Sequence, residues 1–370
     1  MAFEPITLFP GELLEGAQRI ARSGGTNDSA IPASVIRDMG WNSTLIAEEH
    51  GGFGGLFNDI GALLEGLASR AVNLPVITRC CVVPGMLMSV SETEAVKSLL
   101  SQIAEGEVCV ELGAPDLLES HDSRNELAVP RLTRSGNGWR LTGTLNAVEW
   151  TADCTHVLLC ARDTKDDTPY VVILETAQLP ESGATFSTVE WRQVRQIDID
   201  NLELGNNAVL AQGEAARKMC QTGWALAQAA IATDIVCTMN AMLAETIRYL
   251  QDRKQFGQPL AEFQVLRHDV ARLYVEFETC KNLLMSSLRS LDITAANSER
   301  LAAFDLLGLY IREQAIEFAQ SVIQLHGGMG MTRETLAARM ASRMISLAFR
   351  FGDAYAHTRA LSEFQKGRQQ

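Results

Sequence analysis

The sequence lacks the cysteine and histidine patterns that most often carry metal or redox chemistry. No Cys-x-x-Cys pair occurs in the 370 residues, and no histidines stand at metal-ligand spacing. The eight cysteines are scattered and lie mostly in apolar runs; they are Cys80, Cys81, Cys109, Cys154, Cys160, Cys220, Cys237 and Cys280. Such a distribution is typical of buried thiols in a reducing compartment. We therefore expect no metal site.

The sequence is also short of positive charge and of membrane-length apolar runs. Its formal net charge of -13 argues against a nucleic-acid partner, although a few local arginines could still hold a small anionic cofactor. No basic-then-apolar leader opens the chain, and the longest apolar stretch is interrupted by Asp234. These absences predict a cytoplasmic protein without membrane insertion.

Hydrophobic residues make up 46% of the chain, and their spacing changes twice along it. Helical 3-4 spacing in residues 1–115 gives way to short alternating runs and turns in residues 116–212, and helical spacing returns in residues 213–370. The chain is long for a single core, so several domains are expected. The pattern predicts an α+β protein with an N-terminal helical domain, a middle antiparallel β domain and a C-terminal four-helix bundle.

The β domain and the bundle each have their own signals. The expected strands include residues 139–142, 155–161, 170–174 and 194–199. The expected bundle seam includes Phe263, Leu266, Val270, Phe277, Phe304, Ile311 and Phe318. Helices with one apolar seam pack as an antiparallel bundle. No Gly-x-Gly-x-x-Gly follows a strand, which excludes a Rossmann domain.

Two motifs carry candidate binding chemistry. The first is Arg253-Lys-Gln-Phe-Gly-Gln-Pro-Leu260, followed by Phe263-Gln264, where Gly257 and Pro259 turn one helix into the next. That turn presents Arg253 at a helix end, where a guanidinium can hold a pyrophosphate through two hydrogen bonds.

The second motif is Gln324-Leu-His-Gly-Gly-Met-Gly330, which places three glycines directly after an apolar helix. One glycine would suffice for a helix C-cap, whereas three allow close backbone approach by a ligand or another subunit. A third segment, residues 48–55, combines Glu48 and Glu49 with four glycines. We expect it to form a turn with a structural role and no role in the chemistry.

Together these segments resemble the acyl-CoA dehydrogenase family, in its order and over essentially the whole chain. The resemblance implies FAD as cofactor and a dimer of dimers, with the two binding motifs facing a flavin held mainly by a neighbouring subunit. The residues expected to line that flavin are Arg253, Gln255, Phe256, Gln264, Gln324, Gly327 and Gly328.

The sequence departs from the family where the catalytic base is expected. The family usually places this glutamate in a Glu-Gly-Thr triplet, and the corresponding triplet here is Phe351-Gly352-Asp353. A second family location on the first long C-terminal helix falls on Ala227. Neither position carries the glutamate.

Asp234 is the candidate substitute. It lies two turns beyond Ala227 on the same helix face, and it matches a site where short family members, including some that act on sterol side chains, place a glutamate. A carboxylate isolated in an apolar stretch gains basicity from desolvation. The alternative is that Asp234 pairs with an arginine from another helix or subunit.

The β domain departs from the family as well. The flavin-side loop reads Val110-Glu-Leu-Gly-Ala-Pro-Asp116 and lacks the usual Gly-Ser pair, and the usual Trp-x-Thr is replaced by Ala147-Val148-Glu149-Trp150. The residues with which this chain would contact its own flavin therefore differ from the family's pattern. Arg253 and Gln324, which would contact the flavin of a neighbouring subunit, match it.

The sequence thus predicts α,β-dehydrogenation of an acyl-CoA thioester, with an electron-transferring flavoprotein as electron acceptor. One version is a homotetramer with Asp234 as base. The other is a heterotetramer with a related subunit that supplies the flavin-binding β domain and the glutamate. A family-related flavin oxidase or monooxygenase, and a non-catalytic acyl-CoA-binding or scaffold subunit, are the alternatives.

Overall fold

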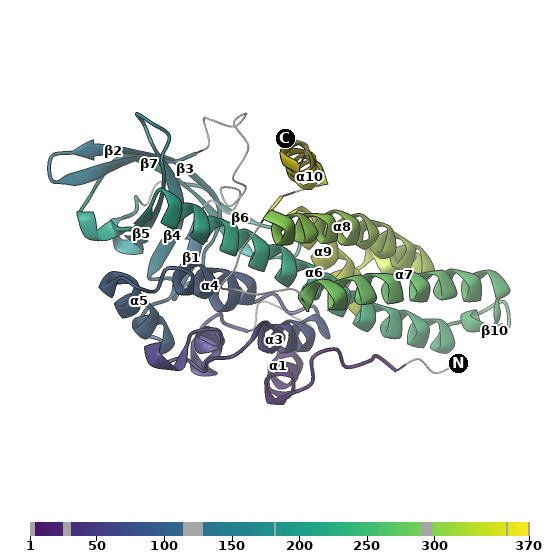
Figure 1. The fold of residues 1–370 in the computed structure, drawn as a ribbon. Helices are drawn as coiled ribbons and strands as arrows, with labels where there is room; N and C mark the ends of the chain where they lie inside the picture. The colour runs from purple at the N-terminus through teal and green to yellow at the C-terminus, as the bar shows by residue number, and fades with distance from the viewer. Residues whose placement is uncertain are drawn as a thin grey trace.

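The computed structural model describes residues 4–24, 31–113, 129–180, 183–289, 298–352 and 354–368. Within them the chain forms a helical N-terminal part, a middle sheet and a long helical bundle (Figure 1). The predicted α+β architecture is confirmed.

The N-terminal part packs short helices around one apolar core. They are α1 (Glu12–Ser23), α2 (Val35–Asp38), α3 (Phe57–Ala68), a π-helical turn (Ile77–Val82) that continues into α4 (Val83–Met88), and α5 (Glu94–Ala104). The glycine-rich turn after Glu48 is tightly packed, since a Cβ at Gly52 would overlap the carbonyl of Ile46. This crowding fits the architectural role expected of that segment.

The middle part is one eight-stranded sheet. Its strands are β1 (Val110–Gly113), β2 (Arg131–Ser135), β3 (Gly138–Glu149), β4 (His156–Asp163), β5 (Pro169–Glu175), β6 (Thr185–Ser187), β7 (Gln193–Leu204) and β8 (Val209–Gln212). The order is β6-β7-β3-β2-β4-β5-β8, and β1 also pairs with β4. Most neighbours are antiparallel, as expected, but β1 and β2 both run parallel to β4.

The two faces of β4 belong to different cores. Val157 and Leu159 face the sheet's own core, whereas Leu158 and Cys160 face the larger core shared with the helices. This alternation follows from the two-residue period of a strand. One face of the sheet therefore packs directly against the first helix of the bundle.

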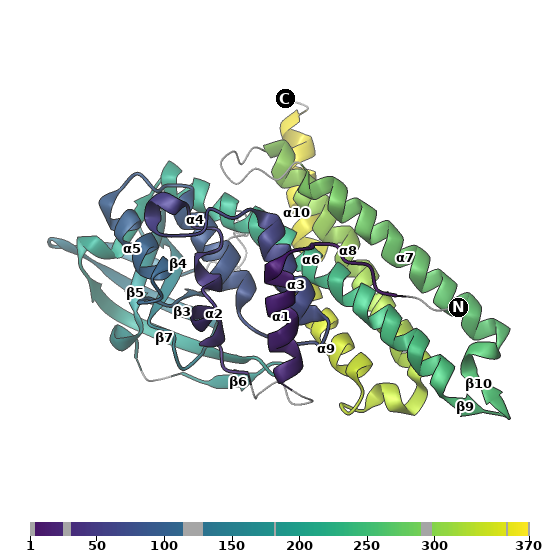
Figure 2. The same cartoon turned by 90° about the horizontal axis from the view of Figure 1, so that it is seen from below.

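That helix, α6 (Glu214–Asp252), is the central element of the fold. Its 39 residues span roughly 58 Å, and they run from beside the sheet to the far end of the bundle (Figures 1 and 2). It is long and apolar enough to cross a membrane, but 94% of its most apolar window is buried inside the protein. The window is therefore the core of this fold.

The remaining helices pack around α6. They are α7 (Gln264–Leu288), α8 (Ser298–His326), α9 (Leu336–Phe349) and α10 (Ala354–Arg368), and a small hairpin of β9 (Lys254–Gln255) and β10 (Gln258–Pro259) joins α6 to α7. Of the expected seam, Phe277, Phe304, Ile311 and Phe318 are fully buried. Phe263, Leu266 and Val270 are only half-buried, because the first turns of α7 lie at the outer end of the bundle.

Candidate functional site

The hairpin that follows α6 presents the first motif to solvent. Phe256 and Gly257 both have left-handed backbone, with φ of 53° and 83°, the geometry of a tight two-residue turn. Phe256 is 89% exposed at the tip and contacts the ring of Phe263 edge-on, with 6.1 Å between ring centroids. The main chain of Arg253 is fixed by hydrogen bonds to Tyr249 and Leu260.

The second motif lies at the same end of the bundle. The ring of His326 stacks on Tyr249 at 4.2 Å between centroids, and the Tyr249 hydroxyl donates to the His326 carbonyl at 3.2 Å. Burial lowers the pKa of His326 to about 4, so the stacked ring is neutral at pH 7. This stack joins the helix that ends at Arg253 to the turn that begins at Gly327.

Together the two motifs form an exposed surface that carries hydrogen-bond donors and glycines with free space around their backbone. All seven residues expected at a neighbour's flavin are solvent-exposed, namely Arg253, Gln255, Phe256, Gln264, Gln324, Gly327 and Gly328. A Cβ at either Gly327 or Gly328 would meet nothing within 4 Å, so the protein itself does not require glycine there for space. That openness suits close approach by a molecule outside this chain.

At the junction of sheet and bundle, the chain's own flavin-side segments meet in a buried ion-pair network. Glu149, at the end of β3, accepts hydrogen bonds from Arg350 and, at 2.8 Å, from Arg192. Glu111 of β1 is fully buried and pairs with Arg79. The two segments that replace the family's flavin-side contacts therefore contain Glu111 and Glu149, and Arg350 directly precedes the expected base triplet.

Further partners complete the network on both sides. Arg79 also donates to both carboxylate oxygens of Asp153, at 2.9 and 3.1 Å, and Arg192 donates to Glu190 at 2.6 Å. The network thus holds three guanidinium groups against four carboxyl groups, Glu111, Glu149, Asp153 and Glu190. One carboxyl is in excess.

The hydroxyl of Thr78 identifies which carboxyl keeps a proton. Thr78 Oγ1 lies 3.1 Å from Glu111 Oε2, 3.0 Å from Glu149 Oε2 and 3.1 Å from the Pro75 carbonyl, yet a hydroxyl has one proton to donate. Burial raises the pKa of Glu111 to about 7, helped by neighbouring Glu149. Burial acts the same way on Glu149, but Arg350 and Arg192 outweigh it and lower its pKa to about 2. A protonated Glu111 that donates to Thr78 satisfies both observations.

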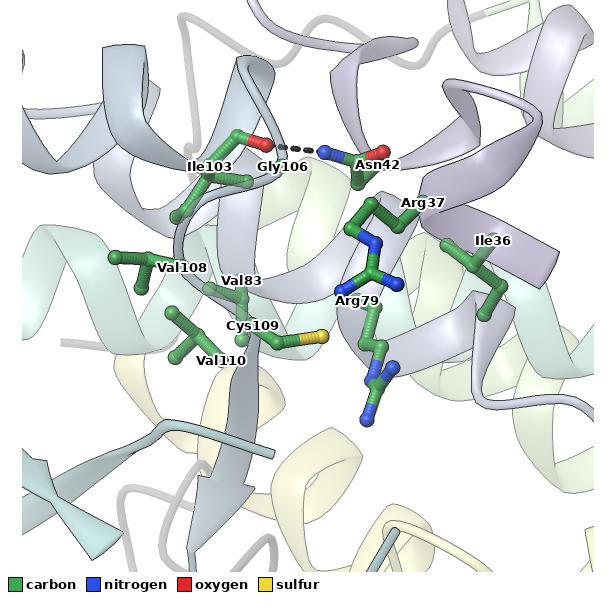
Figure 3. A pocket seen from close by; sticks show the side chains of 10 residues that line it. All are labelled: Ile36, Arg37, Asn42, Arg79, Val83, Ile103, Gly106, Val108, Cys109 and Val110. Carbon is green, nitrogen blue, oxygen red and sulfur yellow. Dashed lines mark hydrogen bonds between the residues drawn. The ribbon is translucent and has the colours of Figure 1, made fainter. Parts of the chain in front are cut away.

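A small cavity adjoins this network beside Arg79. Its volume is about 10 Å³, and Arg37, Asn42 and Cys109 also line it (Figure 3). That volume is roughly the minimum for a single water. Within the described residues, Oδ1 of Asn42 is buried without a partner, which makes it the natural acceptor for such a water.

Asp234 is not an isolated carboxylate. Its Oδ2 lies 2.6 Å from Nη2 of Arg343 on α9, and its Oδ1 lies 3.1 Å from Nε of the same guanidinium. Both side chains are buried, and Arg343 also donates to the Val72 carbonyl at 2.6 Å and to Asn73. Of the two arrangements that the sequence leaves open, isolation and pairing with an arginine, the structure shows the pairing, because α9 brings an arginine from 109 residues away.

The two positions at which the resemblance would place the glutamate lie close together. The side chain of Gln228, next to Ala227, donates to the Phe351 carbonyl at 2.9 Å. Ala227 and Phe351 are both buried and apolar, and Asp353 lies outside the described residues. Neither Ala227 nor Phe351 can remove a proton.

Sequence reasoning missed Arg79, Arg192 and Arg350 as parts of this junction. A signal was present, because Glu149 stands in the segment that replaces Trp-x-Thr and Arg350 directly precedes the expected base triplet. Opposite charges in a flavin-side segment and beside the expected base triplet indicate a changed site. Among the described residues, no group of three or more His, Cys, Asp or Glu is placed to hold a metal ion.

Comparisons with known proteins agree with the geometry. Residues 218–363 match the family model "Acyl-CoA dehydrogenase, C-terminal domain". The chain is 27% identical to the acyl-CoA dehydrogenase FadE28 of Mycobacterium tuberculosis over 321 residues, covering 81% of this chain and 85% of that protein. It is 26% identical to IpdE2 of the same organism over 170 residues, covering 45% of this chain and 51% of IpdE2.

Solved structures share the whole fold. A variant of the Tcur3481–Tcur3483 steroid ACAD superposes with a TM-score of 0.79 at 21% identity, covering 97% of this chain and 98% of that one. The ChsE4–ChsE5 complex of Mycobacterium tuberculosis gives 0.77 at 15% identity, covering 98% and 99%. These findings support an acyl-CoA dehydrogenase family member, with the family model matched over the C-terminal part and the fold shared over the whole chain.

FAD, the cofactor of this family, fits one of the two places that the resemblance indicates. The exposed surface around Arg253 and Gly328 offers a cation, amides and open backbone. The junction around Glu149 does not fit a flavin ring, because its charged groups are buried and already bonded to one another. Opening it would leave several buried charges without partners, each at a cost of several kcal/mol.

Proposed function

We propose that this chain is one subunit of a heteromeric acyl-CoA dehydrogenase and completes the FAD site of a related partner subunit. The observation that carries the proposal is the buried Glu149–Arg192–Arg350 network, which includes a segment where the resemblance expects this chain's own flavin contacts, while the residues expected at a neighbour's flavin are exposed. The reaction is α,β-dehydrogenation of an acyl-CoA thioester.

In this assignment, the chain binds and orients but does not carry the reacting groups. Bound FAD supplies the hydride acceptor. Arg253 has the charge and the fork geometry for a pyrophosphate, and Gln264 and Gln324 supply amide donors and acceptors. The open backbone of Gly327 and Gly328 admits the cofactor's adenosine end.

The base belongs to the partner in this proposal. A homotetramer with Asp234 as base would have to break the Asp234–Arg343 pair, leaving a buried guanidinium without its carboxylate. A glutamate on a related subunit avoids that cost. The heteromeric version is therefore favoured over the homomeric one.

Exposed apolar side chains on the outer bundle helices support assembly. Val265 and Val275 of α7 are 65% and 62% exposed, and Leu306 of α8 is 53% exposed. Exposed apolar groups of this size on bundle helices are available for subunit contacts. Two of the similar solved structures are named as pairs of proteins, Tcur3481–Tcur3483 and ChsE4–ChsE5, and the first is called a steroid ACAD. We infer a heterotetramer, a bulky sterol-type acyl group as substrate, and an electron-transferring flavoprotein as acceptor.

The test is to purify the chain alone and with a co-expressed related subunit that retains the glutamate and the Gly-Ser flavin loop. We expect no bound flavin on the chain alone and one FAD per pair of subunits in the complex, measured by absorbance after protein quantitation. One FAD per chain in the isolated protein would contradict the proposal.

The activity of the same complex separates the remaining functions. Reduction of an artificial electron acceptor by acyl-CoA identifies a dehydrogenase, and acyl-CoA-dependent consumption of dioxygen identifies an oxidase. A flavin-loaded complex in which mutation of the partner's glutamate leaves turnover unchanged would contradict the assignment of the base.

A further inference from the structure

Two buried cysteines from different parts of the fold lie sulfur to sulfur. Cys160 of β4 and Cys220 of α6 are 60 residues apart in sequence, and their Sγ atoms are 3.0 Å apart. This is well inside the roughly 3.5–4.0 Å of an ordinary contact between heavy atoms. Among the eight cysteines, all within the described ranges, this is the one pair of sulfurs that shares a hydrogen bond.

The fold brings these two side chains together by its strand alternation. Cys160 points from β4 toward the helices, opposite to Leu159 and Ala161, which point into the sheet's own core. Cys220 lies near the start of α6, where the helix passes under the sheet (Figure 1). An S–S bond is about 2.0 Å long, so the sulfurs need to close by only about 1 Å.

The hydrogen bond between the two sulfurs shifts the pKa values of the two thiols in opposite directions. A hydrogen bond from Cys160 and the charge of Arg162 lower the pKa of Cys220, against the opposing effect of burial. The same hydrogen bond and burial raise the pKa of Cys160. Cys220 is therefore the better nucleophile, with Cys160 as the resolving thiol.

We propose that Cys160 and Cys220 are a redox-active pair that closes to a reversible disulfide between the sheet and the first bundle helix, with a hydroperoxide as oxidant. The Cys220 thiolate attacks a peroxide oxygen, the O–O bond breaks, and a sulfenic acid and hydroxide form. The Cys160 sulfur then attacks the Cys220 sulfur, the S–O bond breaks, and water leaves. Two thiols and one hydrogen peroxide thus give one disulfide and two waters.

Closure would tie two elements that are otherwise joined by noncovalent packing alone. β4 belongs to the sheet and α6 to the bundle, so the disulfide fixes the position of the sheet relative to the bundle helices. A cross-link that spans 60 residues restricts the unfolded chain and stabilises the folded one. The oxidised protein should therefore unfold at a higher temperature than the reduced one.

The test exposes the full-length reduced chain to stoichiometric hydrogen peroxide and maps its cysteines by mass spectrometry without reduction. We expect the loss of two hydrogen atoms from the intact mass, a Cys160–Cys220 cross-link, and full reversal by dithiothreitol. Thermal unfolding of the oxidised form should shift upward and return on reduction.

Matched variants make the result specific. Cys220→Ala should abolish the cross-link, and Cys160→Ala should leave a Cys220 sulfenic acid that dimedone traps. Cys280→Ala, another buried cysteine with no sulfur neighbour, should behave like the wild type. A wild-type chain whose mass is unchanged, or which gains oxygen at Cys220 without cross-linking, or which links other cysteines, would overturn the proposal without any variant having to fold.

Discussion

Asp234 and Arg343 face each other across the α6–α9 interface as a two-point ion pair, with oxygen–nitrogen distances of 2.6 and 3.1 Å. Neither side chain is more than 6% exposed. The Arg343 guanidinium also donates to the Val72 carbonyl and Asn73, so one buried cation ties α6, α9 and the segment after α3 together. This geometry assigns Asp234 a structural role.

Asp234→Asn should therefore destabilise the fold, because it leaves the Arg343 charge buried without its carboxylate. The expected loss is about 3–5 kcal/mol in the free energy of unfolding, measured by urea denaturation. The control is Glu214→Gln, which removes a surface ion pair to Arg217 and should change stability little. If Asp234→Asn kept its stability and still abolished turnover of the complex, Asp234 would be the base after all.

Arg253→Ala should weaken flavin retention by the assembled complex and leave the stability of the isolated chain unchanged. A lost charge-assisted contact to pyrophosphate corresponds to roughly 1.5–3 kcal/mol, or about ten- to a hundredfold in affinity. Flavin released on dilution, followed by fluorescence, measures the effect. Arg248→Ala is the matched control, because Arg248 lies about one turn earlier on α6 and pairs with Glu245. Equal flavin retention in the two variants would refute the role of Arg253.

Glu111→Gln should remove a pH dependence of stability. The pKa of Glu111 is raised from 4.5 to about 7 on folding, mainly by burial. The folded chain therefore binds more protons than the unfolded chain between these values, and its stability falls as the pH rises through about 7. The glutamine variant imitates the protonated form and should lack this fall.

Unfolding titrations between about pH 5 and pH 8 measure the difference. The two proteins should be similar at the acid end, and the variant should be relatively more stable at the alkaline end. Glu203→Gln, at an exposed carboxylate, should follow the wild type. If the Glu111→Gln variant instead lost stability relative to the wild type as the pH rises, the prediction would be wrong.

Gly308→Ala should destabilise the bundle. A Cβ there would lie 2.9 Å from Cε1 of His357 and 3.2 Å from Oε1 of Gln228, in a region where both side chains are fully buried. Overpacking of this kind costs about 1–3 kcal/mol. Gly328→Ala is the contrasting variant, since its Cβ would meet nothing within 4 Å and should leave thermal unfolding unchanged. Similar melting temperatures for both variants would contradict the packing argument.

The helices and strands were predictable because their signals are local. The 3-4 spacing that places Phe277 and Phe318 on the apolar faces of their own helices predicts their burial, and alternation predicts a strand at residues 194–199, which lie within the longer β7. The binding motifs were also local, since the turn at Gly257 fixes where Arg253 is presented.

The polar junction was not predictable, because its members come from distant parts of the chain. Glu149 meets an arginine 201 residues later, and Thr78 meets a glutamate 33 residues later. Ala114–Asp116 and Asp353, two other departures from the family, lie outside the described residues. A sequence shows that a flavin-side residue has changed, but the partners of the new charge depend on how the segments pack.

The polar contacts around Glu149 extend without a break through all three parts of the molecule. Asn73 donates to the Glu190 carbonyl at 2.9 Å and accepts from Arg343, which connects the sheet's ion pairs to the pair at Asp234. Cutting the chain between its parts would therefore leave buried charged groups without their partners on both fragments. Calorimetry of the intact subunit should show a single cooperative transition, and slow amide hydrogen exchange should be lost from sheet and bundle together. We therefore expect a chimera that carries the middle sheet of a relative to lose these buried pairs and to fold poorly.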